Sequence, residues 1–198
     1  GLKAMEYINK WRDIFKEYKP ILPVEVATGP VMENIQRGKE VDLYKFPIPK
    51  WHELDGGRYI GTGSMVITED PEEGWVNIGT YRGMLHDRDT IGFYISPMQH
   101  GNLMRRKYWS KGLSCPVAVA FGQEPALFAA ATCFLPWGVP EYDFAGYLRG
   151  EPVEVVKGEV TGLPIPAFAE IVIEGEAPPP EEELDKLLAE AEILYCMY

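Results

Sequence analysis

The residues best suited to chemistry gather in one stretch, residues 75–101, which reads WVNIGTYRGMLHDRDTIGFYISPMQHG. This stretch contains Asn77, Arg82 and the pair Gln99 and His100, placed in or just after two runs with the pattern of β-strands. Polar side chains at the ends of strands are a common way for a sheet to present a ligand site. We therefore expect a binding site here.

Three residues from separate segments could share a metal ion, namely Asn77, His100 and Glu141. Their mixture of oxygen and nitrogen donors suits a divalent ion such as Mn²⁺ or Mg²⁺ better than a thiolate-bound zinc. A lone histidine is more often a packed or surface residue, so residue types alone leave both interpretations open. His52 and His86 are interpreted as structural.

Other residues and motifs give weaker evidence for catalysis. Glu170 and Glu174 point to one face of an expected strand, where they form either a carboxylate pair or a solvated surface. The sequence has no Walker-type loop, no GxSxG and no CxxC. Nucleotide hydrolysis, serine hydrolase chemistry and thiol-disulfide exchange therefore have no motif behind them.

Composition restricts the class of protein. The chain has 198 residues, of which 46% are hydrophobic, and this is enough for one domain with a substantial core. A formal net charge of -11 argues against a nucleic-acid partner. No apolar run approaches the ~20 residues of a membrane span. The chain has three cysteines, an odd count, and they are scattered along it: Cys115, Cys133 and Cys196. This indicates reduced thiols in a cytoplasmic protein.

Helices are expected at both ends of the chain. Apolar residues recur at three- and four-residue steps over residues 2–18, and Pro20 and Pro23 end this helix. A segment rich in proline and glutamate leads into a second amphipathic helix at residues 184–195. We expect the two apolar stripes either to cover the body of the protein or to pair across a dimer interface.

Between these helices, the patterns favour short strands and a few short helices without regular strand-helix-strand repeats. Such an order predicts an α+β fold built on an antiparallel barrel. The expected strands are residues 24–28, 59–68, 116–121, 153–156 and 169–174, the expected helices are 101–111, 125–132 and 141–148, and a hairpin turn is expected at 70–74.

Several sequence blocks keep a fixed order over residues 30–175: DGGRYIGTGSMVITEDPEEG, NIGTYRGM, SPMQH, AVAFGQEPA, GVPEYDFAGYLRGEPVEVV and PAFAEIVIEG. Together they resemble the central, cofactor-binding domain of the UbiD family of decarboxylases. This resemblance is specific, because independent blocks agree. It implies a split β-barrel related to flavin reductases.

The resemblance also implies cofactors. Family members use prenylated FMN, a flavin that acts as an electron sink while CO₂ leaves. The positions matching Asn77, His100 and Glu141 hold a metal that bridges to the flavin phosphate, which fits an acidic protein that binds an anion. A K⁺ ion is implied near the same phosphate, at Ala131 and Cys133. FMN itself is the alternative flavin.

Arg82 matches the catalytic arginine of the family. A guanidinium there would bind the carboxylate of an unsaturated or aromatic acid and orient a neighbouring glutamate. Thr80 and Gln99 match positions that line the flavin, together with His100 and Cys133.

The sequence departs from the family pattern after the FAEIVIEG block. Family members continue into an EGPFGE-like segment with two catalytic glutamates, where this chain reads PPPEEE. We therefore expect a terminal helix in residues 1–20, a flavin-binding domain in 21–177 and a linker with a helix in 178–198.

Three functional interpretations follow. The first is a decarboxylase-related protein that obtains its missing glutamates from a partner chain in a homo- or hetero-oligomer. The second is an FMN-binding split-barrel protein with a redox or carrier role, and the third is a non-catalytic assembly subunit. Flavin absorbance separates the third from the others, and CO₂ release separates the first from the second.

Overall fold

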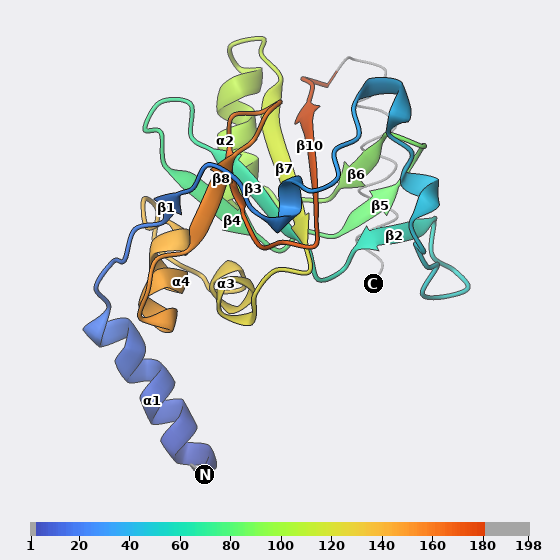
Figure 1. Cartoon of the computed structure of the whole chain (residues 1–198). Coiled ribbons are helices and arrows are strands. Elements are labelled where there is room, and N and C mark those ends of the chain that lie inside the picture. The colour runs from blue at the N-terminus through green and yellow to red at the C-terminus, as the bar shows by residue number, and fades with distance from the viewer. Residues whose placement is uncertain (1–2, 181–198) are drawn as a thin grey trace.

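The computed structural model describes residues 3–180 of the chain, and a four-stranded antiparallel sheet lies at its centre (Figure 1). The strand order is β10 (Ile171–Ala177), β7 (Cys115–Phe121), β3 (Met65–Glu69), β4 (Val76–Gly79). The middle strands are rich in β-branched and small apolar residues, which suit a strand covered on both faces. This sheet carries the hairpin that begins the predicted site.

Two smaller sheets flank the central one, and each has three strands in the described residues. In one of them β1 pairs with β8 in parallel, whereas all other strand pairs are antiparallel. Each described sheet has an open strand order, so the fold is mixed α+β and no closed barrel is formed among these residues. The two sheets are β2 (Arg58–Gly61), β5 (Gly83–Leu85), β6 (Ile91–Phe93) and β1 (Val24–Glu25), β8 (Glu154–Lys157), β9 (Pro164–Pro166).

The helices begin and end where local chemistry allows. Proline stands at the first position of α3, where its missing N–H costs nothing. Gly150 ends α4 in the left-handed conformation, with φ of 80°. The helices are α1 (Ala4–Glu17), α2 (His100–Trp109), α3 (Pro125–Ala131) and α4 (Glu141–Arg149), with short 3-10 turns at Pro30–Met32, Gly38–Glu40 and Leu43–Lys45.

One strand prediction was wrong, and one strand was missed. Residues 59–68 form two strands, β2 and β3, in different sheets, because the chain bends at residues 62–64 between them. Strand β9 was missed because prolines at both of its ends argue against a strand. The two prolines are tolerated because β9 lies at the edge of its sheet.

The main core lies between the central sheet and the pair α3 and α4. Tyr142 and Phe144 of α4 pack there against Ile67 and Ile78 of the sheet, and all four side chains are buried. Large apolar side chains of this kind each contribute about 1.5–3 kcal/mol when fully buried. Their packing fixes the first residue of α4, Glu141, against strand β4.

Helix α1 extends away from the body, and none of its residues is buried (Figure 1). It contacts the body at its C-terminal end, where the Phe15 ring stacks on the Phe144 ring with centroids 5.2 Å apart. The expectation that its apolar stripe covers the body is therefore wrong for Met5, Ile8 and Trp11, which remain exposed. Pairing across a dimer interface stays a prediction, and the helix expected at residues 184–195 lies outside the described residues.

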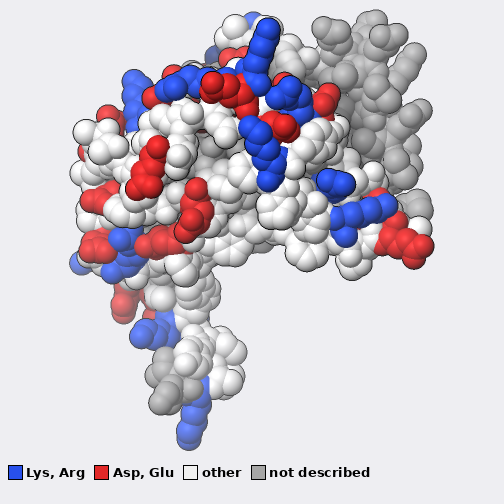
Figure 2. Space-filling model, turned by 45° about the vertical axis from the view of Figure 1, so that its right-hand side comes forward, with Lys and Arg blue, Asp and Glu red and all other residues white. Residues whose placement is uncertain are grey.

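Charged side chains of both signs intermingle on the face shown in Figure 2. In the part of the chain that the structure describes, no helix is long and apolar enough to cross a membrane.

The turn between β3 and β4 is held by a buried carboxylate. Asp70 accepts hydrogen bonds from the backbone N–H groups of Glu72 and Glu73, each at 2.9 Å, and an ion pair from Lys107 Nζ at 2.7 Å. Burial alone would raise the pKa of Asp70, but these hydrogen bonds and the Lys107 charge hold that pKa below its usual range. Because Lys107 lies on α2, Asp70 ties the hairpin to the helix that begins with His100.

We expect Asp70→Ala to lower the free energy of unfolding by about 2 kcal/mol at pH 7, since it removes charge-assisted hydrogen bonds from a buried position. Urea denaturation measures the change. A group with a lowered pKa stabilises above its unfolded pKa, so the difference between the two proteins should shrink as the pH falls through the pKa of folded Asp70. The control is Glu72→Gln, an exposed partner of the same lysine, with an expected cost clearly smaller than that of Asp70→Ala. Equal costs for both variants would contradict the assignment.

Candidate cofactor and metal site

A cavity of about 540 Å³ opens beside the end of strand β4. Its walls come from four segments that are distant in sequence: β4 with the residues after it, the residues before α2, the end of α3 and the start of α4. The cavity brings together all of the predicted site residues, which are Asn77, Thr80, Arg82, Gln99, His100, Ala131, Cys133 and Glu141.

Glu141 is the buried carboxylate of this cavity, with an exposed fraction of 3%. One of its oxygens accepts the backbone N–H of Ile78 at 2.8 Å. Burial raises the pKa of Glu141 to about 7, although the hydrogen bond from Ile78 opposes this rise. No ion pair of Glu141 exists among the described residues, so the carboxylate is suited to a cation.

Asn77 is also buried, and its amide is oriented by its neighbours. Its Nδ2 donates to Thr68 Oγ1 at 3.4 Å, and the Thr68 hydroxyl in turn donates to the sulfur of Met104 at 3.3 Å. With the amide nitrogen directed to Thr68, the amide oxygen is left as a donor atom for a ligand.

His100 is the first residue of α2, and burial lowers the pKa of its imidazole. The ring is therefore neutral at pH 7 and can offer a nitrogen lone pair to a metal. Together the three residues supply oxygen, nitrogen and oxygen donors with one negative charge, which fits Mn²⁺ or Mg²⁺. The described residues contain no group of three histidine, cysteine or acidic residues that could hold an ion, and this candidate set has only two of them, with an amide as its third member.

The end of α3 offers a second kind of cation site. Ala131, Thr132 and Cys133 line the cavity where the helix ends, and the carbonyl end of a helix attracts positive charge. Burial raises the pKa of the Cys133 thiol, and its Sγ donates to the Ala129 carbonyl at 3.2 Å. Cys133 thus stays protonated, so its backbone carbonyl is the group suited to a K⁺ ion.

Thr80 and Arg82 alternate with Tyr81 after strand β4. The Tyr81 ring is buried over Gly79, where an added Cβ would meet it at 2.3 Å, and its hydroxyl accepts the N–H of Gly101 at 3.4 Å. Because Tyr81 faces inward, Thr80 and Arg82 lie exposed at the cavity. Arg82 makes no ion pair within the described residues, so its guanidinium is available for a carboxylate.

The mouth of the cavity also carries large apolar side chains. Met98 is 83% exposed and Phe134 is 90% exposed. Met98 was missed, although its place in the SPMQH block was a signal. Apolar side chains this exposed are suited to contact a planar ring or another protein surface.

The carboxylates at residues 170 and 174, considered above as a pair, lie elsewhere. Glu170 and Glu174 do not line the cavity, and neither do His52 and His86. Glu174 accepts the Thr161 hydroxyl at 2.6 Å and the backbone N–H groups of residues 159–161. Its role is thus to hold the turn before β9.

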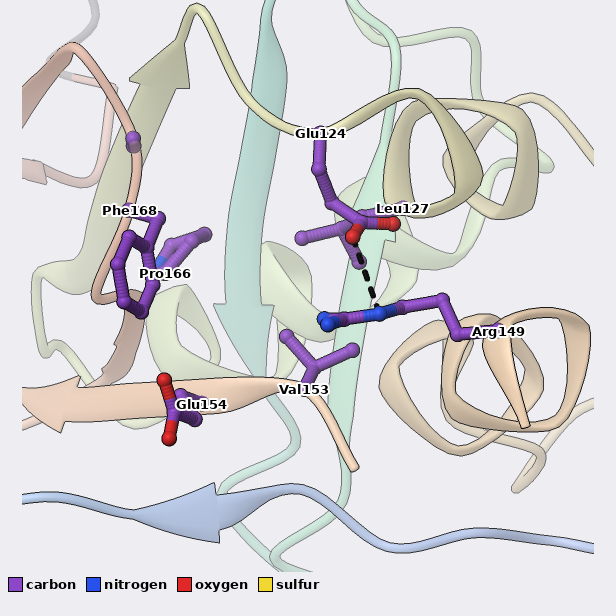
Figure 3. Close-up of a pocket in the computed structure, with 8 residues that line it drawn as sticks. Glu124, Leu127, Arg149, Val153, Glu154, Pro166 and Phe168 are labelled. Atoms are coloured by element: carbon purple, nitrogen blue, oxygen red, sulfur yellow. Dashed lines mark ion pairs between the residues drawn. The ribbon is translucent and has the colours of Figure 1, made fainter. Parts of the chain in front are cut away.

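A smaller pocket of about 240 Å³ lies between α3, α4 and the sheet of β8 and β9 (Figure 3). Arg149 points across it to Glu124, with Nε and Oε2 3.0 Å apart, and also pairs with Glu151. None of the predicted site residues lines this pocket. Its arginine is already paired with carboxylates, so the pocket is a weaker candidate for an anionic ligand.

A cavity of this size with a few convergent polar groups is typical of small-molecule binding sites. The family model described as UbiD, 3-octaprenyl-4-hydroxybenzoate carboxy-lyase Rift-related domain, matches residues 23–191. The chain therefore belongs to the UbiD family.

Similar proteins include decarboxylases. The chain is 42% identical over 172 residues to the pyrrole-2-carboxylic acid decarboxylase of Pseudomonas aeruginosa, covering 87% of this chain and 35% of that protein. It is 35% identical to ferulic acid decarboxylase 1 of Saccharomyces cerevisiae, covering 87% of this chain and 34% of that protein. The chain thus spans about a third of the length of these relatives.

The fold also resembles solved structures. HmfF of Pelotomaculum thermopropionicum, a UbiD-class enzyme in complex with prFMN, superposes with a TM-score of 0.80 at 33% identity, over 87% of this chain and 40% of that one. The closed form of vanillic acid decarboxylase from Sedimentibacter hydroxybenzoicus gives a TM-score of 0.83 at 28% identity, over 90% of this chain and 39% of that one.

Proposed function

We propose that these residues form the cofactor-binding domain of a decarboxylase that uses prenylated FMN to release CO₂ from an unsaturated or aromatic carboxylic acid. The observation that carries this proposal is the convergence of four distant segments on one cavity of about 540 Å³, a volume typical of pockets for cofactor-sized ligands. The decarboxylases among the relatives support the reaction type.

In this proposal Asn77, His100 and Glu141 hold Mn²⁺ or Mg²⁺ at the flavin phosphate. The argument is electrostatic: a chain with a net charge of -11 and a buried carboxylate repels phosphate unless a cation lies between them. The carbonyls of Ala131 and Cys133 would hold a K⁺ ion beside the same phosphate.

Prenylated FMN, when bound, supplies the electron sink for decarboxylation. Arg82 would bind the substrate carboxylate through paired N–H donors and hold its orientation in the cavity. Thr80 and Gln99, which line the cavity, would contact the flavin. The exposed side chains of Met98 and Phe134 would supply apolar contacts at the mouth of the cavity.

A proton donor is also needed, and Glu141 is the only carboxylate among the described residues that line the cavity. Because Glu141 is assigned to the metal, we propose that the donor comes from outside these 198 residues, either from a longer chain or from a partner in an oligomer. We further infer that residues 21–177 form one domain and that its sheets are parts of a split barrel. The cytoplasmic location stays a prediction.

The test is to produce the protein together with a flavin prenyltransferase and to identify the released ligand by mass spectrometry. The expected result is prenylated FMN bound with one Mn²⁺ per chain. The reaction is then tested by CO₂ release and by H/D exchange at the carboxylate position of candidate acids. Both are measured on a protein of the relatives' full length. Protein that carries no flavin would contradict the proposal.

One observation favours a second function. HmfF has also been solved in complex with FMN, and Glu141 is the only carboxylate in the described cavity lining. An FMN-binding domain with a redox or carrier role would retain unmodified FMN in the same experiment and release no CO₂.

A further inference from the structure

Three aromatic rings meet beside the cavity, which is lined by His100 but not by Trp75 or Trp137. The His100 ring lies 5.5 Å from the Trp75 ring and 5.3 Å from the Trp137 ring, and the two tryptophan rings are 5.0 Å apart, all between centroids. The three interplanar angles are 81°, 88° and 82°. Each ring is thus nearly perpendicular to the other two, an edge-to-face arrangement that aromatic side chains favour. We call this group the aromatic triangle.

The members of the aromatic triangle come from three different segments. Trp75 precedes β4 and is 9% exposed, His100 begins α2, and Trp137 lies in the loop between α3 and α4. Trp137 is 38% exposed, so burial alone does not hold it in place.

Trp137 is instead held by polar contacts from the other side. Its Nε1 donates to Glu73 Oε2 at 3.0 Å, and Lys107 Nζ lies 5.1 Å from the ring centroid. Lys107 is itself fixed by its ion pair with the buried Asp70. The hydrogen bond and the cation-π contact restrict where the exposed part of the ring can lie. The ring of Trp137 is therefore fixed to the hairpin and to α2.

The His100 ring takes part in none of the hydrogen bonds among the described residues. A metal-binding histidine usually donates its second ring N–H to a carboxylate or carbonyl, and that contact sets the ring orientation. Here the described surroundings supply two perpendicular tryptophan rings in place of that acceptor. Edge-to-face contacts with two rings of different orientation restrict rotation of the imidazole about its Cβ–Cγ bond.

We propose that Trp137, together with Trp75, is a positioning residue that fixes the imidazole of His100 so that one nitrogen faces the cavity. This inference rests on the proposed function, because it gives His100 the role of a metal ligand. Trp137 also lies four residues before Glu141. It therefore connects the loop that leads to Glu141 with the ring of His100. The contacts of Glu73 and Lys107 with Trp137 thereby link the hairpin between β3 and β4 to the orientation of His100.

The test compares Trp137→Ala with Trp137→Phe, which keeps an aromatic ring, and with Trp51→Ala as a control at an exposed tryptophan away from the site. Electron paramagnetic resonance measures Mn²⁺ affinity in the presence of FMN. We expect Trp137→Ala to weaken Mn²⁺ binding by about 10–100-fold, as loss of a supporting contact usually does, with most of the affinity restored in Trp137→Phe. Trp51→Ala should bind like the parent.

Two further measurements separate positioning from folding. The melting temperature of metal-free protein should change little in Trp137→Ala, because the side chain is partly exposed. NMR of the His100 ring in metal-free protein should show ring-current shifts from Trp137 that vanish in the variant. Glu73→Leu, which leaves the tryptophan but removes its acceptor, should produce the same changes in smaller size.

The outcomes are distinct. If Trp137→Ala binds Mn²⁺ as tightly as the parent, or loses affinity only in proportion to a lower melting temperature, the positioning role is overturned. If the parent and His100→Ala bind Mn²⁺ equally, the metal assignment of the proposed function fails. In that case the ring-current shifts in metal-free protein still decide whether Trp137 orients His100.

Discussion

Replacing Glu141 with glutamine is expected to abolish retention of both metal and flavin phosphate. The substitution keeps the shape and the acceptor for the Ile78 N–H but removes the only carboxylate among the described residues that line the cavity. Loss of a supporting contact costs 10–100-fold in metal affinity, so loss of a direct ligand should cost more than about 100-fold. Mn²⁺ content and flavin absorbance after purification measure the effect.

The same substitution should stabilise the metal-free protein. Burial raises the pKa of Glu141 from 4.5 to about 7, so between these pH values the folded state binds its proton more tightly than the unfolded state. The parent therefore loses free energy of unfolding as the pH rises through this window, and glutamine does not. At pH 8 the metal-free variant should be more stable by up to about 3 kcal/mol. Urea denaturation at pH 5 and pH 8 measures the difference.

The control is Glu170→Gln, a carboxylate that does not line the cavity. It should leave metal content and flavin content as in the parent. Unchanged Mn²⁺ and flavin in Glu141→Gln would refute the ligand role. Equal stability of the Glu141 variant and the parent at pH 8 would instead show that the carboxylate has a partner when no metal is bound.

The second large effect concerns turnover by the 198-residue chain alone. Loaded with prenylated FMN, it should release CO₂ more slowly than the relatives of full length by at least about 10²-fold, which is the usual contribution of a positioned acid. Arg82 cannot supply the proton, because a guanidinium stays charged at any working pH. Glu170 and Glu174 lie outside the cavity lining, and Glu174 is already used by the turn at residues 159–161.

The measurement is CO₂ release from an aromatic and an unsaturated acid, with and without a polypeptide that contains an EGPFGE-like segment. Turnover should rise when that polypeptide is added, and Arg82→Ala should abolish the gain while flavin stays bound. Rapid decarboxylation by the isolated chain would contradict the prediction. It would mean that a group within these 198 residues donates the proton.

Much of the fold was predictable from local pattern. The apolar run that forms β7, the proline that begins α3 and the glycine that ends α4 act through contacts within a few residues, and each element was found to within a few positions. The division of residues 59–68 into β2 and β3 was not predictable, because both halves keep a strand pattern. Only pairing with different partners separates them.

For the site, the sequence identified the family through the blocks that hold Asn77, Arg82, His100 and Glu141, and it predicted that these residues carry the chemistry. Only the tertiary structure decided their environment. Glu141 meets Ile78 across 63 residues of sequence, and burial at that meeting raises its pKa. The aromatic triangle likewise depends on three distant segments. Desolvation and ring contacts arise from packing in space, and residue order alone does not encode which side chains exclude water from one another.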